Sequence, residues 1–356
     1  MWSLKTKGIL SSILLTASLG LGQEFNNLSE LYNQKQYGKL IEAADSLFKS
    51  GIVSPQVQSL VGRAYVDIGQ PENALPHLRT VLNTPNIIPG WMNAWCIYYM
   101  SKAHAKIGNM DSTHYYLEEA LKTKGAKNIV TAAQMDLVSL GFSPVFKNWT
   151  TIETNNFRFL FKNSTKVKNT LEYANDRQEA FDSINSFFNS ELPKKIDFYV
   201  WNNFIEFSRK NKMNSGFAIP ELAIVHTRHF QTRGHEMAHV ISHFAEKSKS
   251  ITAFINEGTA TCFDLSNRNK TEMAKLARKK SDISIIDIWK SDRIFREIDP
   301  NSAYAISGAF VEFLIKEGGK ENFLKLLSDQ SYENAKVIYG NDLERIVKNF
   351  ETTIKI

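Results

Sequence analysis

The residues whose types and spacing could do chemistry lie in the segment QTRGHEMAHVISHF, at positions 231–244. His235 and His239 are four positions apart, so on a helix their imidazoles share one face and could both bind a single tetrahedral metal ion. Glu236 follows the first histidine directly and would lie close enough to act on a water molecule held by that ion. This HExxH spacing therefore predicts a metal site with a proton acceptor beside it.

The third candidate ligand is Glu257, in the segment AFINEGTATCFDL. It follows His239 by 18 positions, which is enough for the chain to turn and run a second helix antiparallel to the first. Two histidine nitrogens and one carboxylate oxygen are a common ligand set of catalytic zinc, with the fourth position left for water. Alternatively, Glu257 is a charge near the N-terminus of a helix that Asn256 caps. We expect the ligand role, and with it one Zn²⁺ per chain.

The helix that carries the histidines needs an apolar face to anchor it. Met237, Val240, Ile241 and Phe244 follow the i, i+3, i+4, i+7 spacing of a buried helical stripe. Thr232, just ahead of the helix, is the expected N-cap. The segment GFAIPELAIVHT, at 216–227, precedes it and predicts an edge strand, which either pairs with an extended substrate or has no ligand.

The other histidines near this segment are expected to be structural. His243 lies one helical turn past His239, and a metal held by the first two histidines cannot easily extend to it. We expect it at the surface or in the core. His226 and His229 flank the end of the preceding strand and are expected to be structural or exposed.

The two motifs together resemble a known family. HEMAH followed by INEGTA is similar to the gluzincin branch of the zinc metallopeptidases, and with YAISGAFVEFLIKEGG downstream it resembles the peptidase MA-like domains of exported bacterial proteins. The similarity covers roughly residues 150–330. It implies a zinc-dependent protease, a hydrolase acting on the peptide bonds of a peptide or protein substrate. It also implies that zinc lies on His235, His239 and Glu257, with Glu236 as the general base. A metzincin would need a histidine at position 245, which is alanine.

Some positions match the family pattern only loosely. Many gluzincins carry an acid four residues after the glutamate ligand, where it orients a ligating histidine; here that position is Thr261, and the nearest acid is Asp264. Support for the histidine would then come from either side chain, from a backbone carbonyl or from elsewhere. Tyr304 is the candidate catalytic donor to the oxyanion, as a tyrosine after the glutamate helix is in related peptidases. Its spacing to Gly308 matches only loosely, and packing is the alternative role.

The N-terminal part of the chain repeats itself. The segment VGRAYVDIGQPENALPHLRTVL recurs 39 positions later, with small residues, a turn glycine and large apolar residues in matching places, in SKAHAKIGNMDSTHYYLEEAL. This resembles a tetratricopeptide repeat, whose usual period is 34, with the extra residues in the loop TPNIIPGW. An earlier segment, LYNQKQYGKLIEAADSLF, resembles a third unit. The repeats either dock a partner protein or form a packing module, and most aromatic residues there are expected in the core: Trp91, Trp95, Tyr98, Tyr99, Tyr115 and Tyr116.

These patterns predict an α+β protein with two domains. The helical pattern stops around 141–144, which is the expected boundary. We predict an all-α, tetratricopeptide-like repeat domain over 23–145 and a zincin-like metallopeptidase domain over 150–356. Within the second domain we expect strands at 150–161, 196–201 and 221–227, a helix over 166–190, and helices over 302–354.

The first 22 residues bear on the cellular location of the protein. A short basic start, an apolar run of signal-peptide length and small residues before Gln23 predict a cleaved secretory signal. The alternative is an uncleaved membrane anchor, for which the run is short. We therefore expect an exported protein, periplasmic or secreted, whose mature chain has no stable membrane span.

The composition excludes some classes of protein and of partner. The 356 residues are 43% apolar and 22% charged, which excludes a wholly disordered chain. The net charge of +6 is spread along the sequence without a basic block that contains aromatics, so we expect no nucleic-acid partner. Cys96 and Cys262 are the only cysteines, so at most one disulfide is possible.

Two functions from different classes fit these patterns. The first is an exported zinc metallopeptidase. The second is a non-catalytic scaffold, in which the repeats hold a partner and the second domain has a peptidase-like fold without turnover. The presence of Glu236 beside all three candidate ligands favours catalysis.

Overall fold

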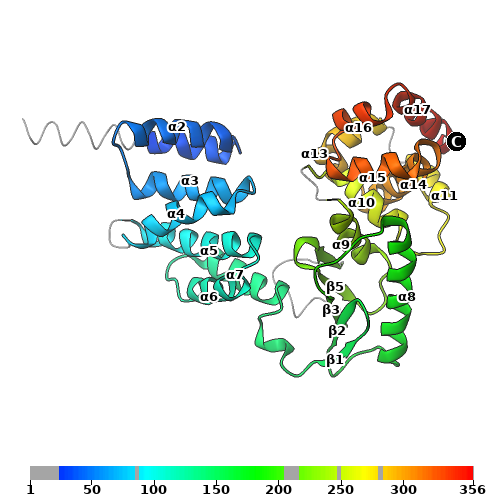
Figure 1. Cartoon of the computed structure of the whole chain (residues 1–356), viewed down its shortest axis with the longest axis horizontal. Coiled ribbons are helices and arrows are strands. Elements are labelled where there is room, and N and C mark those ends of the chain that lie inside the picture. The colour runs from blue at the N-terminus through cyan, green and yellow to red at the C-terminus, as the bar shows by residue number, and fades with distance from the viewer. Residues whose placement is uncertain (1–23, 85–87, 204–215, 247–249, 280–283, 356) are drawn as a thin grey trace, which may run out of the picture. The chain divides into compact units, whose positions relative to one another are not determined.

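In the computed structural model, residues 24–84, 88–203, 216–246, 250–279 and 284–355 are described (Figure 1). The predicted signal segment, 1–22, lies outside these residues. The chain divides into two compact units, Met1–Ser143 and Pro144–Ile356. The division falls within the segment GFSP at 141–144, where the helical pattern of the sequence stops.

The first unit is built from stacked helices. Neighbours along the chain pack on one another from α3 to α7, and α5 also contacts both α3 and α7. Gly62 permits one of these approaches, because a Cβ there would lie 2.8 Å from Leu78. The helices span residues 24–33, α2 (Tyr37–Lys49), α3 (Pro55–Asp67), α4 (Pro71–Leu82), α5 (Gly90–Lys106), α6 (Met110–Leu121) and α7 (Lys127–Ser139).

The turns in the two repeated segments are alike. Gly69 follows α3 and Gly108 follows α5, with φ of +79° and +78°. Glycine is favoured there because a side chain is strained in this left-handed region. The next N–H groups, of Gln70 and Asn109, donate back to helix carbonyls at 2.8 and 2.9 Å. The predicted glycine turns are therefore confirmed.

The aromatic residues of this unit divide between core and surface. Tyr99 is buried as expected, but Trp91 and Tyr115 are 47% and 59% exposed, so the expectation of a core role is wrong for these two. Both are large apolar groups that the stacked helices leave in contact with solvent. Cys96 is buried here and is a free thiol, as is Cys262 in the second unit, so the two are not bridged.

One stretch of the described residues, Lys127–Phe146, is long and apolar enough to cross a membrane by length and composition. The helix α7 occupies its first 13 residues. Its side chains Ile129, Ala133 and Leu137 are buried within the first unit.

The second unit contains a small mixed sheet in the order β1-β2-β3-β5-β4. The three inner strands are parallel, and an antiparallel strand closes each edge. All six residues of β3 are buried, as expected for an internal strand covered on both faces. The strands are β1 (Thr150–Glu153), β2 (Phe157–Phe161), β3 (Ile196–Trp201), β4 (Phe217–Ile219) and β5 (Ile224–Arg228).

Two of the predicted strands are wrong in detail. The segment 150–161 is a hairpin rather than one strand, because the N–H of Thr154 donates to the carbonyl of Phe157 at 3.0 Å and reverses the chain. The segment 216–227 is also not one strand: β4 forms the edge, a short helix η2 (Pro220–Leu222) and Ala223 at φ +51° turn the chain, and β5 is internal. The predicted strand at 196–201 is confirmed as β3, and the predicted strand at 221–227 is confirmed from Ile224 onward as β5.

Helices make up the rest of the second unit, which is α+β. The helix α8 (Thr170–Phe188) packs along the sheet, and α9 (His235–Ala245) lies between the strands and the C-terminal helices (Figure 1). The other helices are η1 (Pro144–Phe146), α10 (Ala253–Cys262), α11 (Lys270–Arg278), α12 (Ile285–Lys290), α13 (Asp292–Glu297), α14 (Pro300–Gly318), α15 (Lys320–Ser328), α16 (Tyr332–Tyr339) and α17 (Asp342–Ile354).

The apolar stripe of α9 anchors it as predicted. Met237, Val240 and Ile241 are fully buried in the core of the unit, and Phe244 is partly buried against it. Thr232 is not the N-cap; Gly234 is, without a capping side chain. The backbone after α10 approaches so closely that a Cβ on Gly234 would lie 2.1 Å from a carbonyl oxygen.

The helices α10 and α14 cross closely, and each has a glycine at the crossing point. A Cβ on Gly258 would lie 2.7 Å from the carbonyl oxygen of Ser307, and a Cβ on Gly308 would lie 2.5 Å from Cγ2 of Thr261. Both distances are shorter than carbon atoms tolerate, so the crossing requires glycine at both positions.

We predict that Gly308→Ala lowers the midpoint of thermal unfolding, at a cost of about 1 to 3 kcal/mol in the free energy of unfolding, because the methyl group overpacks the crossing. The control is Gly38→Ala in α2, where a Cβ meets nothing within 4 Å. It should be neutral or stabilising. An unchanged midpoint for Gly308→Ala, measured by circular dichroism, would contradict the close crossing.

Candidate metal centre

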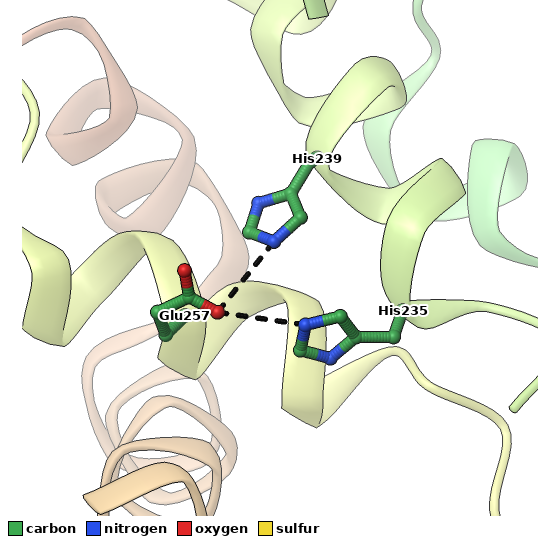
Figure 2. A group of neighbouring side chains, drawn as sticks. All are labelled: His235, His239 and Glu257. Carbon is green, nitrogen blue, oxygen red and sulfur yellow. Dashed lines mark ion pairs between the residues drawn. The ribbon is translucent and has the colours of Figure 1, made fainter. Parts of the chain in front are cut away.

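The structure brings the three predicted ligands together. His235 and His239 project from α9, and Glu257 projects from α10 toward both imidazoles (Figure 2). Oε2 of Glu257 lies 3.5 Å from Nε2 of His235 and 3.6 Å from Nε2 of His239. The possible ligand atoms of all three residues lie within 4.8 Å of one another.

This arrangement fits the dimensions of a tetrahedral metal site. Ligand atoms about 2.0–2.1 Å from a tetrahedral metal are about 3.4 Å from one another. The two nitrogen-to-oxygen distances, 3.5 and 3.6 Å, are close to that value. The side chains of Glu257 and His235 are 24% and 19% exposed, so solvent reaches the cluster. The three residues could therefore hold a divalent metal ion.

Local structure explains why these side chains meet. On α9 the two histidines are one helical turn apart. The N–H of Gly234, at the start of α9, donates to the carbonyl of Asp264 at 3.1 Å, which ties α9 to the end of α10. The N-cap of α10 is Thr252 rather than Asn256, so the alternative that Glu257 follows an Asn256 cap is wrong.

The charges of the cluster stabilise one another. Burial opposes ionisation of Glu257, but the imidazoles of His235 and His239 beside it outweigh this effect and hold the pKa of this carboxyl well below its usual range. Burial opposes protonation of His235, yet hydrogen bonding to Glu257 and the negative charge of Glu236 raise the pKa of this imidazole. The site therefore strongly attracts positive charge.

Glu236 lies beside the cluster and is 7% exposed. Burial raises the pKa of its carboxyl, and the charge of Glu257 adds to this effect against the opposing influence of the two imidazoles. A carboxylate with a raised pKa accepts a proton more readily than one in water. The position is therefore suited to a general base.

Tyr304, on α14, lies beside the cluster and is partly exposed. Its ring centroid is 5.9 Å from that of His235, it stacks on Phe295, and it is 37% exposed. Burial, with the negative charges of Glu257 and Glu236, raises the pKa of its phenol to about 12. Its hydroxyl therefore stays protonated at neutral pH and can donate a hydrogen bond.

Thr261 and Asp264, which were the candidates to support a ligating histidine, have different surroundings. The hydroxyl of Thr261 is buried and has no hydrogen-bond partner among the described residues, and its methyl group lies at Gly308. Asp264 is buried, 3.5 Å from the ammonium of Lys270, and its charge helps to raise the pKa of His235.

The three histidines near the motif, at positions 226, 229 and 243, are not part of the cluster. His226 is fully buried; its Nδ1 accepts a hydrogen bond from the Trp201 indole at 3.0 Å, and its ring stacks on Tyr199 and Phe217. His229 and His243 are half-buried. A structural role for His226 is therefore confirmed.

Sequence reasoning missed the close packing around the base. A Cβ on Gly216 would lie 2.8 Å from Oε1 of Glu236 and 2.9 Å from Oε1 of Gln231. The only signal in the sequence was a glycine ahead of a strand.

In comparisons with known proteins, no family model, no curated protein and no solved structure matches this chain. The functional argument therefore rests on the geometry of the cluster.

We predict that the protein stripped of metal by a chelator becomes less stable as the pH rises from about 6 to about 8.5. The pKa of His235 is raised on folding from its ordinary value of 6.5, so the folded state holds this proton more tightly and loses stability as the imidazole deprotonates. The raised pKa of Glu236 acts in the same direction. Glu257, whose pKa is lowered from 4.5, is ionised in both states over this interval and contributes no slope.

The measurement is the midpoint of thermal unfolding at both pH values. The matched variant is Glu257→Gln, which removes the carboxylate that raises both pKa values and should therefore reduce the slope. Equal slopes in the two proteins would contradict the charge coupling.

Proposed function

We propose that this protein is a zinc-dependent hydrolase of peptide bonds. The observation that carries the proposal is the convergence of His235, His239 and Glu257 within 4.8 Å, with the buried carboxyl of Glu236 beside them. Structural zinc sites usually have four protein ligands, whereas catalytic sites keep one position open. A set of three ligands that solvent can reach favours a catalytic site.

The donor set also favours zinc over other common divalent ions. Magnesium and calcium prefer oxygen ligands, whereas two imidazoles and one carboxylate suit zinc. Copper would prefer a planar arrangement of ligands. We therefore propose one Zn²⁺ per chain.

The residues around the cluster supply the steps of hydrolysis. Bound zinc would lower the pKa of a water molecule and polarise the carbonyl group of the bond to be cut. Glu236 accepts a proton from the attacking water and then delivers it to the leaving amine. The hydroxyl of Tyr304 donates a hydrogen bond to the negative charge that develops on the carbonyl oxygen.

We further propose that the second unit is a gluzincin-like, peptidase MA-like domain. The HExxH helix between a sheet and the helix that carries the third ligand supports this assignment. The edge strand β4 also lies against α9. An extended substrate could add to that edge through its backbone hydrogen bonds.

The first unit is proposed to be a tetratricopeptide-like array that docks a substrate or a partner protein. The Arg63 guanidinium lies 4.4 Å from the Tyr32 ring centroid and 4.6 Å from that of Trp95, so it packs against both rings. Arginine, tyrosine and tryptophan dominate binding hot spots in protein interfaces.

We also propose that the protein is exported, because its first residues are basic and the following run is apolar, as in a secretory signal.

We predict that Glu236→Gln keeps about one zinc ion per chain but lowers peptide cleavage by about 100- to 10,000-fold, because the proton acceptor is lost. The measurements are metal analysis of the purified protein and mass spectrometry of a proteome-derived peptide library after digestion. The control is Glu246→Gln, at the exposed C-terminal end of α9, which should retain full activity.

Three results would contradict the proposal. Full activity of Glu236→Gln would exclude this carboxylate as the base. Absence of zinc would remove the metal centre. A wild-type protein that holds zinc but cleaves no peptide would instead favour a non-catalytic scaffold.

We predict that Tyr304→Phe lowers kcat by about 100-fold with little change in KM, because a donor to the developing oxyanion is lost while the ring contacts remain. The matched control is Tyr339→Phe, because the hydroxyl of Tyr339 is buried and has no hydrogen-bond partner among the described residues. An unchanged kcat in Tyr304→Phe would assign this residue to packing alone.

A further inference from the structure

The loop between β5 and α9 carries Gln231, whose side-chain amide, among the residues that the structure describes, has hydrogen-bond partners at its oxygen only. Oε1 of Gln231 accepts hydrogen bonds from the backbone N–H of Arg228 at 2.7 Å and from the hydroxyl of Thr227 at 3.3 Å. A backbone N–H can only donate, so the atom that faces it must be the amide oxygen. The amide nitrogen of Gln231 is therefore turned to the opposite side, with its two hydrogens directed away from these partners.

This glutamine is a close neighbour of the proposed base. The Cβ position of Gly216, at the start of β4, is 2.9 Å from Oε1 of Gln231, 2.8 Å from Oε1 of Glu236 and 2.7 Å from the carbonyl oxygen of His226. Oxygens of Gln231 and Glu236 thus flank one point of the backbone. Only glycine fits there, and this close fit keeps the two side chains next to the edge strand.

The chemistry of the free end of the amide identifies what it can bind. An –NH2 group donates two hydrogen bonds and accepts none, so its complement is an oxygen acceptor. Gln231 is half-buried, so a bound molecule can reach it. An extended peptide aligned with the edge strand β4 presents a backbone carbonyl at every residue.

We infer that Nε2 of Gln231 donates a hydrogen bond to a backbone carbonyl of the peptide substrate, next to the bond on which Glu236 acts. This inference rests on the proposed peptidase function. Within the described part of the chain, Gln231 is held through its amide oxygen, so the two ends of the amide can be tested separately.

The test is Gln231→Glu, which keeps an oxygen for Arg228 and Thr227 but replaces the donor with an acceptor. The probe is the peptide that the wild-type protein cleaves fastest in the library digestion. Its affinity is measured by calorimetry in the zinc-loaded Glu236→Gln background, where the peptide stays intact and no charge at position 236 opposes the new carboxylate. We expect binding about 10-fold weaker than in Glu236→Gln alone.

The control for the loop is Thr227→Val in the same background, which removes the weaker bond to Oε1 and leaves the donor in place. Its affinity should stay within about 2-fold, because the 2.7 Å bond from Arg228 still orients the amide. Unchanged zinc content and thermal midpoint in both variants exclude a general loss of structure.

The outcomes separate this inference from the proposed function. If the wild-type protein cleaves peptides but Gln231→Glu leaves affinity unchanged, Gln231 is only a loop residue and the inference is wrong. If Thr227→Val weakens binding as much as Gln231→Glu, orientation of the loop rather than the donor is responsible, and the inference is again wrong. If the wild-type protein holds zinc and cleaves no peptide, the proposed function fails first.

Discussion

The carboxylate of Glu257 imposes the main constraint on the second unit. A carboxylate held between packed helices is costly unless charges or hydrogen bonds compensate it. The imidazoles of His235 and His239, at 3.5 and 3.6 Å, provide this compensation, and a divalent cation among the three groups would provide more. The same approach of α9 to α10 therefore serves folding and any chemistry at this site.

Glycines make that approach possible. Gly234 lets the backbone after α10 reach the start of α9, Gly216 lets the edge strand reach Glu236, and Gly258 and Gly308 let α10 and α14 cross. Each contact would be blocked by a single methyl group. Because these contacts converge on the cluster, the positions of the ligands, the base and Tyr304 are coupled through the backbone rather than through long side chains.

The site could be predicted where its geometry is local. A spacing of four residues on a helix fixes the relation of His235 to His239, and the distance in sequence to Glu257 is enough for a second helix. The buried stripe of α9 follows from helical periodicity in the same way. These features depend on neighbouring residues, so the sequence contains them directly.

The rest depends on contacts between distant segments. The alternation over 150–161 continues through a turn at 154–156, so periodicity alone could not separate a hairpin from one strand. Thr232 has the right type for a cap, but the close contact at Gly234 starts the helix there instead. The position of Gln231 beside Glu236 depends on β4, which pairs as the edge of the sheet only in the folded chain.

The most direct test of the metal centre is X-ray absorption at the zinc K edge, recorded on the purified full chain. We expect nitrogen and oxygen neighbours at about 2.0–2.2 Å, with the outer-shell scattering of two imidazoles. The scattering of one imidazole should disappear in His239→Ala. A sulfur neighbour at about 2.3 Å, or a spectrum without imidazole scattering, would contradict the ligand set.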